Sequence, residues 1–175
     1  MQPRLPPTQP SAEEMAFRQG EGTSPPNLQL VIAHAPEIAR LQLELNRAAT
    51  AGMSSRQKEL IILVAGLQTQ NEYCWGHHVP LAVAAGISEA EIRAIRRGDY
   101  SSFQPEEHAL LRFTAAVVSQ QVTDELWAQI SKKRTHEELV KVVMLTSFYC
   151  MMGTLRSALN VPQDAGFGGF ELPLS

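Results

Sequence analysis

The stretch NEYCWGHH, residues 71–78, gathers a thiol and two imidazoles within about one turn of a helix. In a helix Cys74 and His78 are four positions apart and share one face, and His77 borders that face. Cys74 also falls in the first turn, where unpaired backbone N–H groups and the helix dipole favour an anion. That position and a neighbouring imidazolium both lower a thiol pKa, so the spacing favours a nucleophilic thiolate. The alternative is that Cys74 is a small core residue.

A carboxylate precedes this motif by one predicted helix. Glu59 stands at the start of the apolar run LIILVAGL, residues 60–67. A carboxylate at the edge of a buried face has a raised pKa unless it is paired, and proton donors arise in this way. On spacing alone we favour the simpler interpretation, in which Glu59 lies at the surface and complements the helix dipole.

The elements that position these residues are predicted to be helices. Helical signals run from Asn27 onward, and no stretch has the alternation of a strand, so the sequence predicts an all-α domain. Asn27 is the expected cap of the first helix. Residues 36–49 begin with proline and place Ile38, Leu41 and Leu45 on one face. The apolar residues of 51–67 surround their helix, which should be buried on most sides.

Turn residues and caps delimit the later helices. The motif helix should end at Gly86, residues 105–120 open with a proline and two acids, and Pro162 stops the last long helix. Three pairs have the spacing of a capping box, with Ser or Thr followed three residues later by Glu or Gln: Ser54 with Gln57, Ser88 with Glu91, and Thr135 with Glu138.

The chain divides into a proline-rich N-terminal arm, 1–26, a helical domain, 27–162, and a C-terminal loop, 163–175. The arm carries six of the eleven prolines, and we expect one short helical turn after Ser11. Arms of this kind are often disordered or wrap a neighbouring subunit.

Composition narrows the class of protein. The 175 residues carry a net charge of −3 with no basic block, which argues against nucleic acid as a partner. The longest apolar run is too short to cross a bilayer, and the N-terminus lacks a secretory signal, so we expect a cytoplasmic protein without a membrane partner. His108 and His136 are isolated and complete no ligand set with the motif, so we expect no metal, and no cofactor motif is present.

The sequence resembles the carboxymuconolactone decarboxylase family, within the alkylhydroperoxidase D-like superfamily. The resemblance lies in KELIILVAGLQTQNEYCWGHHVPLAVAAGISEAEI, residues 58–92, and in EEHALLRFTAAVVSQQVTDELWAQI, residues 106–130. It implies an all-helical fold that assembles as homo-oligomers, either trimers or hexamers.

The peroxidase branch of that superfamily has an acid, two cysteines and a histidine at fixed spacing. Its acid falls on Glu59, its second cysteine on Cys74 and its histidine on His78, but its first cysteine falls on Asn71. A disulfide cycle within the motif is therefore impossible, and Cys150 or an external thiol would have to resolve a sulfenic acid.

The decarboxylase-like branch is matched more closely, through its pattern of Asn-Glu-Tyr, Trp and His at residues 71–78. This resemblance implies proton transfer and loss of carboxylate from a small lactone acid, with His78 as the acid/base and Glu59 as its partner. Four residues are candidates for substrate contact: Glu72, Tyr73, Trp75 and His77. Packing between helices is the commoner role of the two aromatic residues.

Three functions stay open on this evidence. The favoured one is a decarboxylase-like lyase that handles a small organic acid or lactone. The second is a thiol-dependent hydroperoxide reductase, with peroxiredoxin activity, that uses Cys74. The third is an oligomeric binding protein without catalysis.

Overall fold

The computed structural model describes residues 3–9 and 25–168, and these contain eight helices and no strand. The all-α class predicted from the sequence is confirmed. In chain order the helices are α2 (Asn27–Ile32), α3 (Pro36–Thr50), α4 (Ser55–Gln68), α5 (Glu72–Ala84), α6 (Glu89–Arg96), α7 (Pro105–Ser119), α8 (Asp124–Ser131) and α9 (His136–Ala158).

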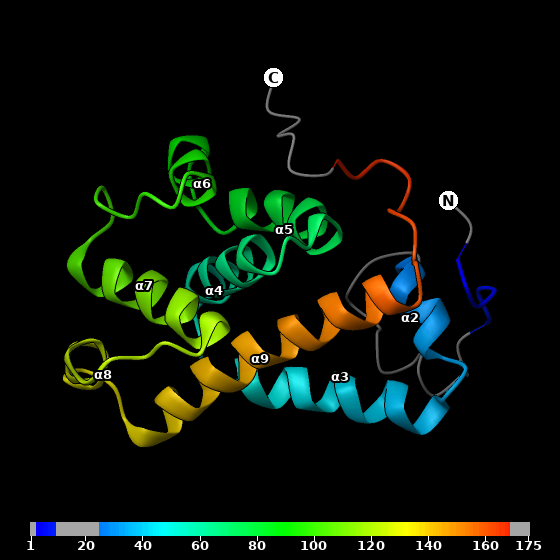
Figure 1. The fold of residues 1–175 in the computed structure, drawn as a ribbon, viewed down its shortest axis with the longest axis horizontal. Helices are drawn as coiled ribbons and strands as arrows, with labels where there is room; N and C mark the ends of the chain where they lie inside the picture. The colour runs from blue at the N-terminus through cyan, green and yellow to red at the C-terminus, as the bar shows by residue number, and fades with distance from the viewer. Residues whose placement is uncertain (1–2, 10–24, 169–175) are drawn as a thin grey trace.

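Helix α4 is the centre of the molecule, because both clusters of core residues include it. Ile61, Ile62 and Ala65 belong to the larger core, which also contains residues of α3, α7 and α9. Leu60, Leu63 and Val64 belong to the smaller core with residues of α5, α6 and α7. Figure 1 shows α4 between α9 and α3 on one side and α5 and α6 on the other. The prediction that this helix is buried on most sides is confirmed.

Most predicted helix ends are confirmed. Ser88 with Glu91 and Thr135 with Glu138 form complete capping boxes, and the Ser54 side chain accepts a hydrogen bond from the Gln57 N–H. Gly86 follows α5 with a φ of +81°, a conformation that glycine adopts at little cost. Asn27 was wrongly predicted as a cap. Pro26 occupies that position instead, and the Asn27 N–H donates to the Asp164 side chain.

The apolar face predicted for 36–49 is exposed in the single chain. Ile38, Leu41 and Leu45 are all exposed, whereas α3 packs inward through Ala39, Gln42, Leu43 and Ala49. The periodic pattern therefore identifies a helix but not the side that faces the core of one chain.

The described part of the N-terminal arm lies against its own chain. The Arg4 backbone N–H donates to the Leu159 carbonyl, and the Thr8 N–H donates to the Leu30 carbonyl. These contacts place residues 3–9 beside α2 and the end of α9 (Figure 1). The helical turn predicted after Ser11 lies outside the described residues.

Helix α9 is long and apolar enough, by length and composition, to cross a membrane. A helix packed inside a protein core has the same composition, and α9 contacts α3, α4, α5 and α7. The expectation of no membrane partner stays a prediction.

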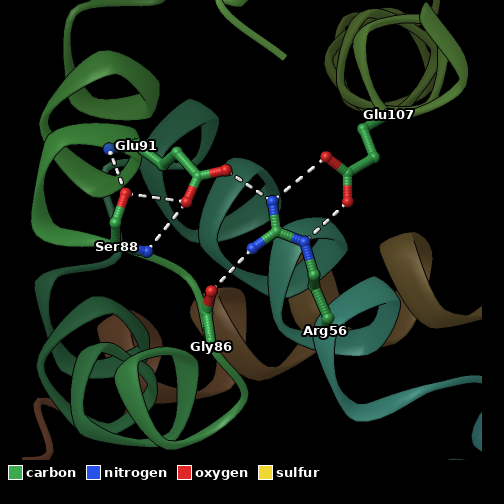
Figure 2. Close-up of polar contacts among 5 residues, drawn as sticks. All are labelled: Arg56, Gly86, Ser88, Glu91 and Glu107. Atoms are coloured by element: carbon green, nitrogen blue, oxygen red, sulfur yellow. Dashed lines mark hydrogen bonds and ion pairs between the residues drawn. The ribbon is translucent and has the colours of Figure 1, made fainter. Parts of the chain in front are cut away.

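A single arginine ties α4 to its neighbours (Figure 2). Arg56 forms ion pairs with Glu107 of α7 at 2.7 Å and with Glu91 of α6 at 2.5 Å. Its third nitrogen donates to the Gly86 carbonyl at 2.9 Å, so the residues that link α5 to α6 are held as well. The Glu91 side chain also accepts from the backbone N–H of Ser88, which joins the capping box to the same network.

We expect Arg56→Met to lower the free energy of unfolding by about 2–3 kcal/mol, because two partly buried carboxylates and a carbonyl lose their charged donor. Urea unfolding followed by circular dichroism measures this change. The matched control is Arg93→Met, which removes an exposed pair with Glu89 and should cost less than about 0.5 kcal/mol. Equal losses in the two variants would contradict the role given to Arg56.

The contribution of Glu91 should also depend on pH. Partial burial acts to raise the pKa of Glu91, but the hydrogen bond from Arg56 and those from Ser88 outweigh it and lower the pKa from 4.5 to about 2. A carboxylate with a lowered pKa stabilises the fold above its ordinary pKa and loses that effect as the pH falls through the folded value. The stability difference between wild type and Arg56→Met should therefore be constant from pH 7 to about 5 and shrink toward pH 2.

Candidate active site

His78, the predicted acid/base, and Glu59, its predicted partner, lie side by side. Helices α4 and α5 form a hairpin whose turn contains Gln70 with a φ of +52° and Asn71 as the cap of α5. This hairpin brings the Glu59 Oε2 to 2.7 Å from the His78 Nδ1. Glu59 is only 1% exposed. The surface position favoured from spacing is therefore wrong, and the paired interpretation holds.

The charge of Glu59 is compensated on both oxygens. Burial acts to raise the pKa of Glu59, but the hydrogen bond and charge of His78, with those of Lys58, outweigh it and hold the pKa below its usual value. Glu59 is therefore a carboxylate, which can only accept hydrogen bonds. The His78 Nδ1 must then carry the proton that is donated to Glu59, and this leaves Nε2 as the ring atom available for chemistry.

A third element holds the imidazole in place. Tyr149 of α9 meets the His78 ring edge to face, with the ring centroids 5.1 Å apart. Contacts with α4 and α9 hold the His78 side chain in place. It is 14% exposed, so it still reaches the surface. A fixed, partly exposed imidazole with a carboxylate on one nitrogen is suited to general acid/base catalysis at the other.

Cys74 lies in the first turn of α5 as predicted, but its thiol is not activated. The Cys74 N–H donates to the Asn71 side chain at 3.1 Å, and the thiol packs against Gly66 and lies 4.0 Å from the Ile62 carbonyl. Burial raises the pKa of the Cys74 thiol far above its ordinary value, and the negative charge of Glu59 raises it further. The expected lowering of this pKa is therefore wrong.

His77 faces a different part of the chain from His78. Its Nε2 lies 2.7 Å from Asp164, which also accepts from the Tyr73 hydroxyl, and Phe167 stacks on the His77 ring at 4.0 Å. At Gly76 a Cβ would collide with the Gly168 carbonyl oxygen, so only glycine permits this close approach. The beginning of the predicted C-terminal loop is therefore packed onto α5.

This contact was missed from the sequence because Asp164 follows His77 by 87 residues and belongs to no motif. Burial lowers the pKa of His77, although the hydrogen bond to Asp164 acts in the opposite direction. Tyr73 is part of the same cluster, because its hydroxyl oxygen accepts from the Leu28 N–H. Both side chains therefore make contacts within the chain.

The other two predicted substrate contacts lie apart from each other. Glu72 is exposed at the start of α5, whereas Trp75 is fully buried in the smaller core. Substrate contact by Glu72, Tyr73, Trp75 and His77 stays a prediction. Cys150 is half-buried, and burial raises the pKa of its thiol.

Two hollows lie elsewhere, one between α8 and α9 and the other where α7, α8 and α9 meet. Their volumes are about 370 and 410 Å³, and both are lined by Trp127 and Val143. Neither is lined by Glu59 or His78. Within the described ranges, no group of three or more His, Cys, Asp or Glu residues is arranged to hold a metal ion.

Several solved structures share this fold. A peroxidase-related AhpD core protein from Ralstonia eutropha JMP134 aligns with a TM-score of 0.78 and 17% identity over 93% of each chain. The debrominase Bmp8, solved in complex with 2,3,4-tribromopyrrole, aligns with a TM-score of 0.77 and 17% identity over 91% of this chain and 90% of its own. A protein of unknown function from Agrobacterium tumefaciens aligns with a TM-score of 0.69 and 20% identity over 77% of this chain and 95% of its own.

At these identities the likeness concerns the fold. No curated protein matches the chain by sequence. Residues 36–116 match the carboxymuconolactone decarboxylase family, and this range includes both Glu59 and His78. The chain therefore carries a domain of the carboxymuconolactone decarboxylase family, with an AhpD-like fold, as its sequence predicted.

Proposed function

We propose that the protein is an acid/base enzyme of the carboxymuconolactone decarboxylase type that acts on a small organic acid or lactone. The observation that carries this proposal is the buried Glu59 carboxylate bound to the Nδ1 of a partly exposed His78. With Nδ1 bound to Glu59, Nε2 is the ring nitrogen left to meet a substrate.

In this mechanism His78 moves the proton and Glu59 holds His78. Loss of carbon dioxide from a carboxylated lactone leaves an electron pair on the carbon skeleton, and the protonated Nε2 supplies the proton that this carbon takes up. Water then returns a proton to Nε2. Glu59 stabilises the imidazolium and keeps the ring oriented through Nδ1, so the reaction needs no reorientation of either group.

The rival activity, thiol-dependent reduction of hydroperoxides, has weaker physical support. It requires a thiolate, whereas Cys74 is buried against Gly66 with a raised pKa. What supports it is the resemblance, because Glu59, Cys74 and His78 fall on the acid, the second cysteine and the histidine of the peroxidase branch. A binding function without catalysis is the third possible outcome of the assays below.

We also propose that the chain forms a homo-oligomer, a trimer or a hexamer, and works in the cytoplasm. Oligomer size comes from the family resemblance. The exposed apolar residues Ile38, Leu41 and Leu45 of α3 support a further contact surface, because a row of large apolar side chains on one helix face is costly to leave in water.

The decisive assay follows release of carbon dioxide from a panel of carboxylated lactones. We expect His78→Ala to reduce turnover by about 10²–10⁴-fold, the usual contribution of a positioned acid/base. Cys74→Ser should retain turnover, because the thiol takes no part in proton transfer.

Turnover that survives His78→Ala would overturn the assignment. A parallel assay follows hydroperoxide consumption with a dithiol reductant. Consumption by the wild type that disappears in Cys74→Ser would establish the peroxidase instead, and the absence of both activities would favour a binding protein.

The state of Cys74 can be tested without any substrate. We expect iodoacetamide to alkylate Cys74 in the folded protein at pH 8 at least about tenfold more slowly than in the urea-unfolded protein, because burial disfavours the thiolate. Mass spectrometry of the Cys150→Ser variant isolates the signal from Cys74. Alkylation that is faster in the folded state would show an activated thiolate and favour the peroxidase.

A further inference from the structure

The Glu59 carboxylate accepts hydrogen bonds from two different nitrogen donors through its two oxygens. Oε2 meets the His78 Nδ1 at 2.7 Å, and Oε1 meets the Lys58 Nζ at 3.1 Å. Lys58 is the preceding residue on α4, and 36% of its side chain is exposed. The Lys58 ammonium group therefore lies at the surface and contacts Glu59, which in turn contacts His78 inside the protein.

The charge of Lys58 changes how tightly the Glu59–His78 pair holds a proton. A buried carboxylate is costly unless a positive charge compensates it. If His78 were the sole compensating group, the pair would hold the second imidazole proton tightly, and Nε2 would give that proton up to the substrate carbon poorly. Lys58 is charged at every pH near neutrality, so it compensates Glu59 whether or not His78 carries its second proton.

Other titratable groups around the pair do not supply this charge. Cys74 and His77 lie on α5, and Tyr149 lies on α9. Burial favours the neutral form of both Cys74 and His77. The groups that act to lower the Glu59 pKa are His78 and Lys58.

We propose that Lys58 is a positioning residue for the acid/base reaction: it compensates Glu59 from the solvent side and so lowers the proton affinity of the Glu59–His78 pair. This inference rests on the proposed function for its catalytic meaning, but the charge effect itself does not depend on any substrate. Because the two groups are coupled, the proton affinity belongs to the pair.

The test is an NMR titration of the His78 ring resonances in the full chain without substrate. Lys58→Met removes the charge, and we expect the ring to titrate about one pH unit higher than in the wild type. Lys58→Arg keeps the charge and should restore the midpoint to within about 0.3 pH units. Lys132→Met, at the end of α8, removes a similar exposed charge elsewhere and corrects for the change in net charge.

A midpoint in Lys58→Met that equals the wild-type value would overturn the proposal, and so would an equal displacement in Lys58→Met and Lys58→Arg. Lys58→Gln is the second uncharged variant if Lys58→Met does not fold, because its amide can still donate to Glu59. It should move the midpoint in the same direction as Lys58→Met.

Failure of this proposal differs from failure of the proposed function. If the titration midpoint moves as expected but no carboxylated lactone loses carbon dioxide, the decarboxylase assignment fails. The role of Lys58 in lowering the proton affinity of the Glu59–His78 pair then stands. If carbon dioxide release depends on His78 but the titration is unchanged in Lys58→Met, the enzyme assignment stands and the role of Lys58 fails.

Discussion

A buried negative charge on the central helix is the constraint around which the site is built. Helix α4 is enclosed by both cores, and Glu59 is carried into the protein with it. A carboxylate in that position is tolerated only if a positive charge or hydrogen-bond donors reach it. Lys58 of the same helix supplies an ammonium group, and His78 of α5 supplies a ring N–H. The need to compensate the charge of Glu59 thus fixes the orientation of the imidazole. The α4–α5 hairpin brings the imidazole within hydrogen-bonding distance of Glu59.

The motif around Cys74 has a different meaning in three dimensions. Asn71, which stands where the peroxidase branch has its first cysteine, caps α5 and binds the Cys74 N–H. One of the N–H groups at the start of α5 that would have stabilised a thiolate is therefore bound by a side chain. The thiol itself points toward α4. The two histidines are separated in the same way, since His77 binds Asp164 and His78 binds Glu59. Adjacent residues in the sequence thus belong to two clusters with separate partners.

Local patterns predicted most of the fold, and distant contacts accounted for most of the errors. The capping boxes at Ser88 and Thr135 depend on neighbours three residues away, so the sequence contains all the information they need. Asn27 was assigned wrongly because its N–H binds Asp164, 137 residues away. Arg56 had no local signal, since both of its carboxylate partners lie on other helices. For the site, the resemblance made Glu59 and His78 candidates, whereas spacing alone favoured a surface position for Glu59. The burial and charge that disfavour a thiolate at Cys74 depend on the packed core.

The most direct test of this account is the protonation of the His78 ring nitrogens, observed in a long-range ¹H–¹⁵N spectrum of the wild type and of Glu59→Gln at a pH where the ring is neutral. We expect that in the wild type Nδ1 carries the proton and Nε2 does not, because Nδ1 donates to the Glu59 carboxylate. In Glu59→Gln this strong preference should weaken, since an amide is a poorer acceptor than a carboxylate. A wild-type ring protonated on Nε2 alone would contradict the central claim.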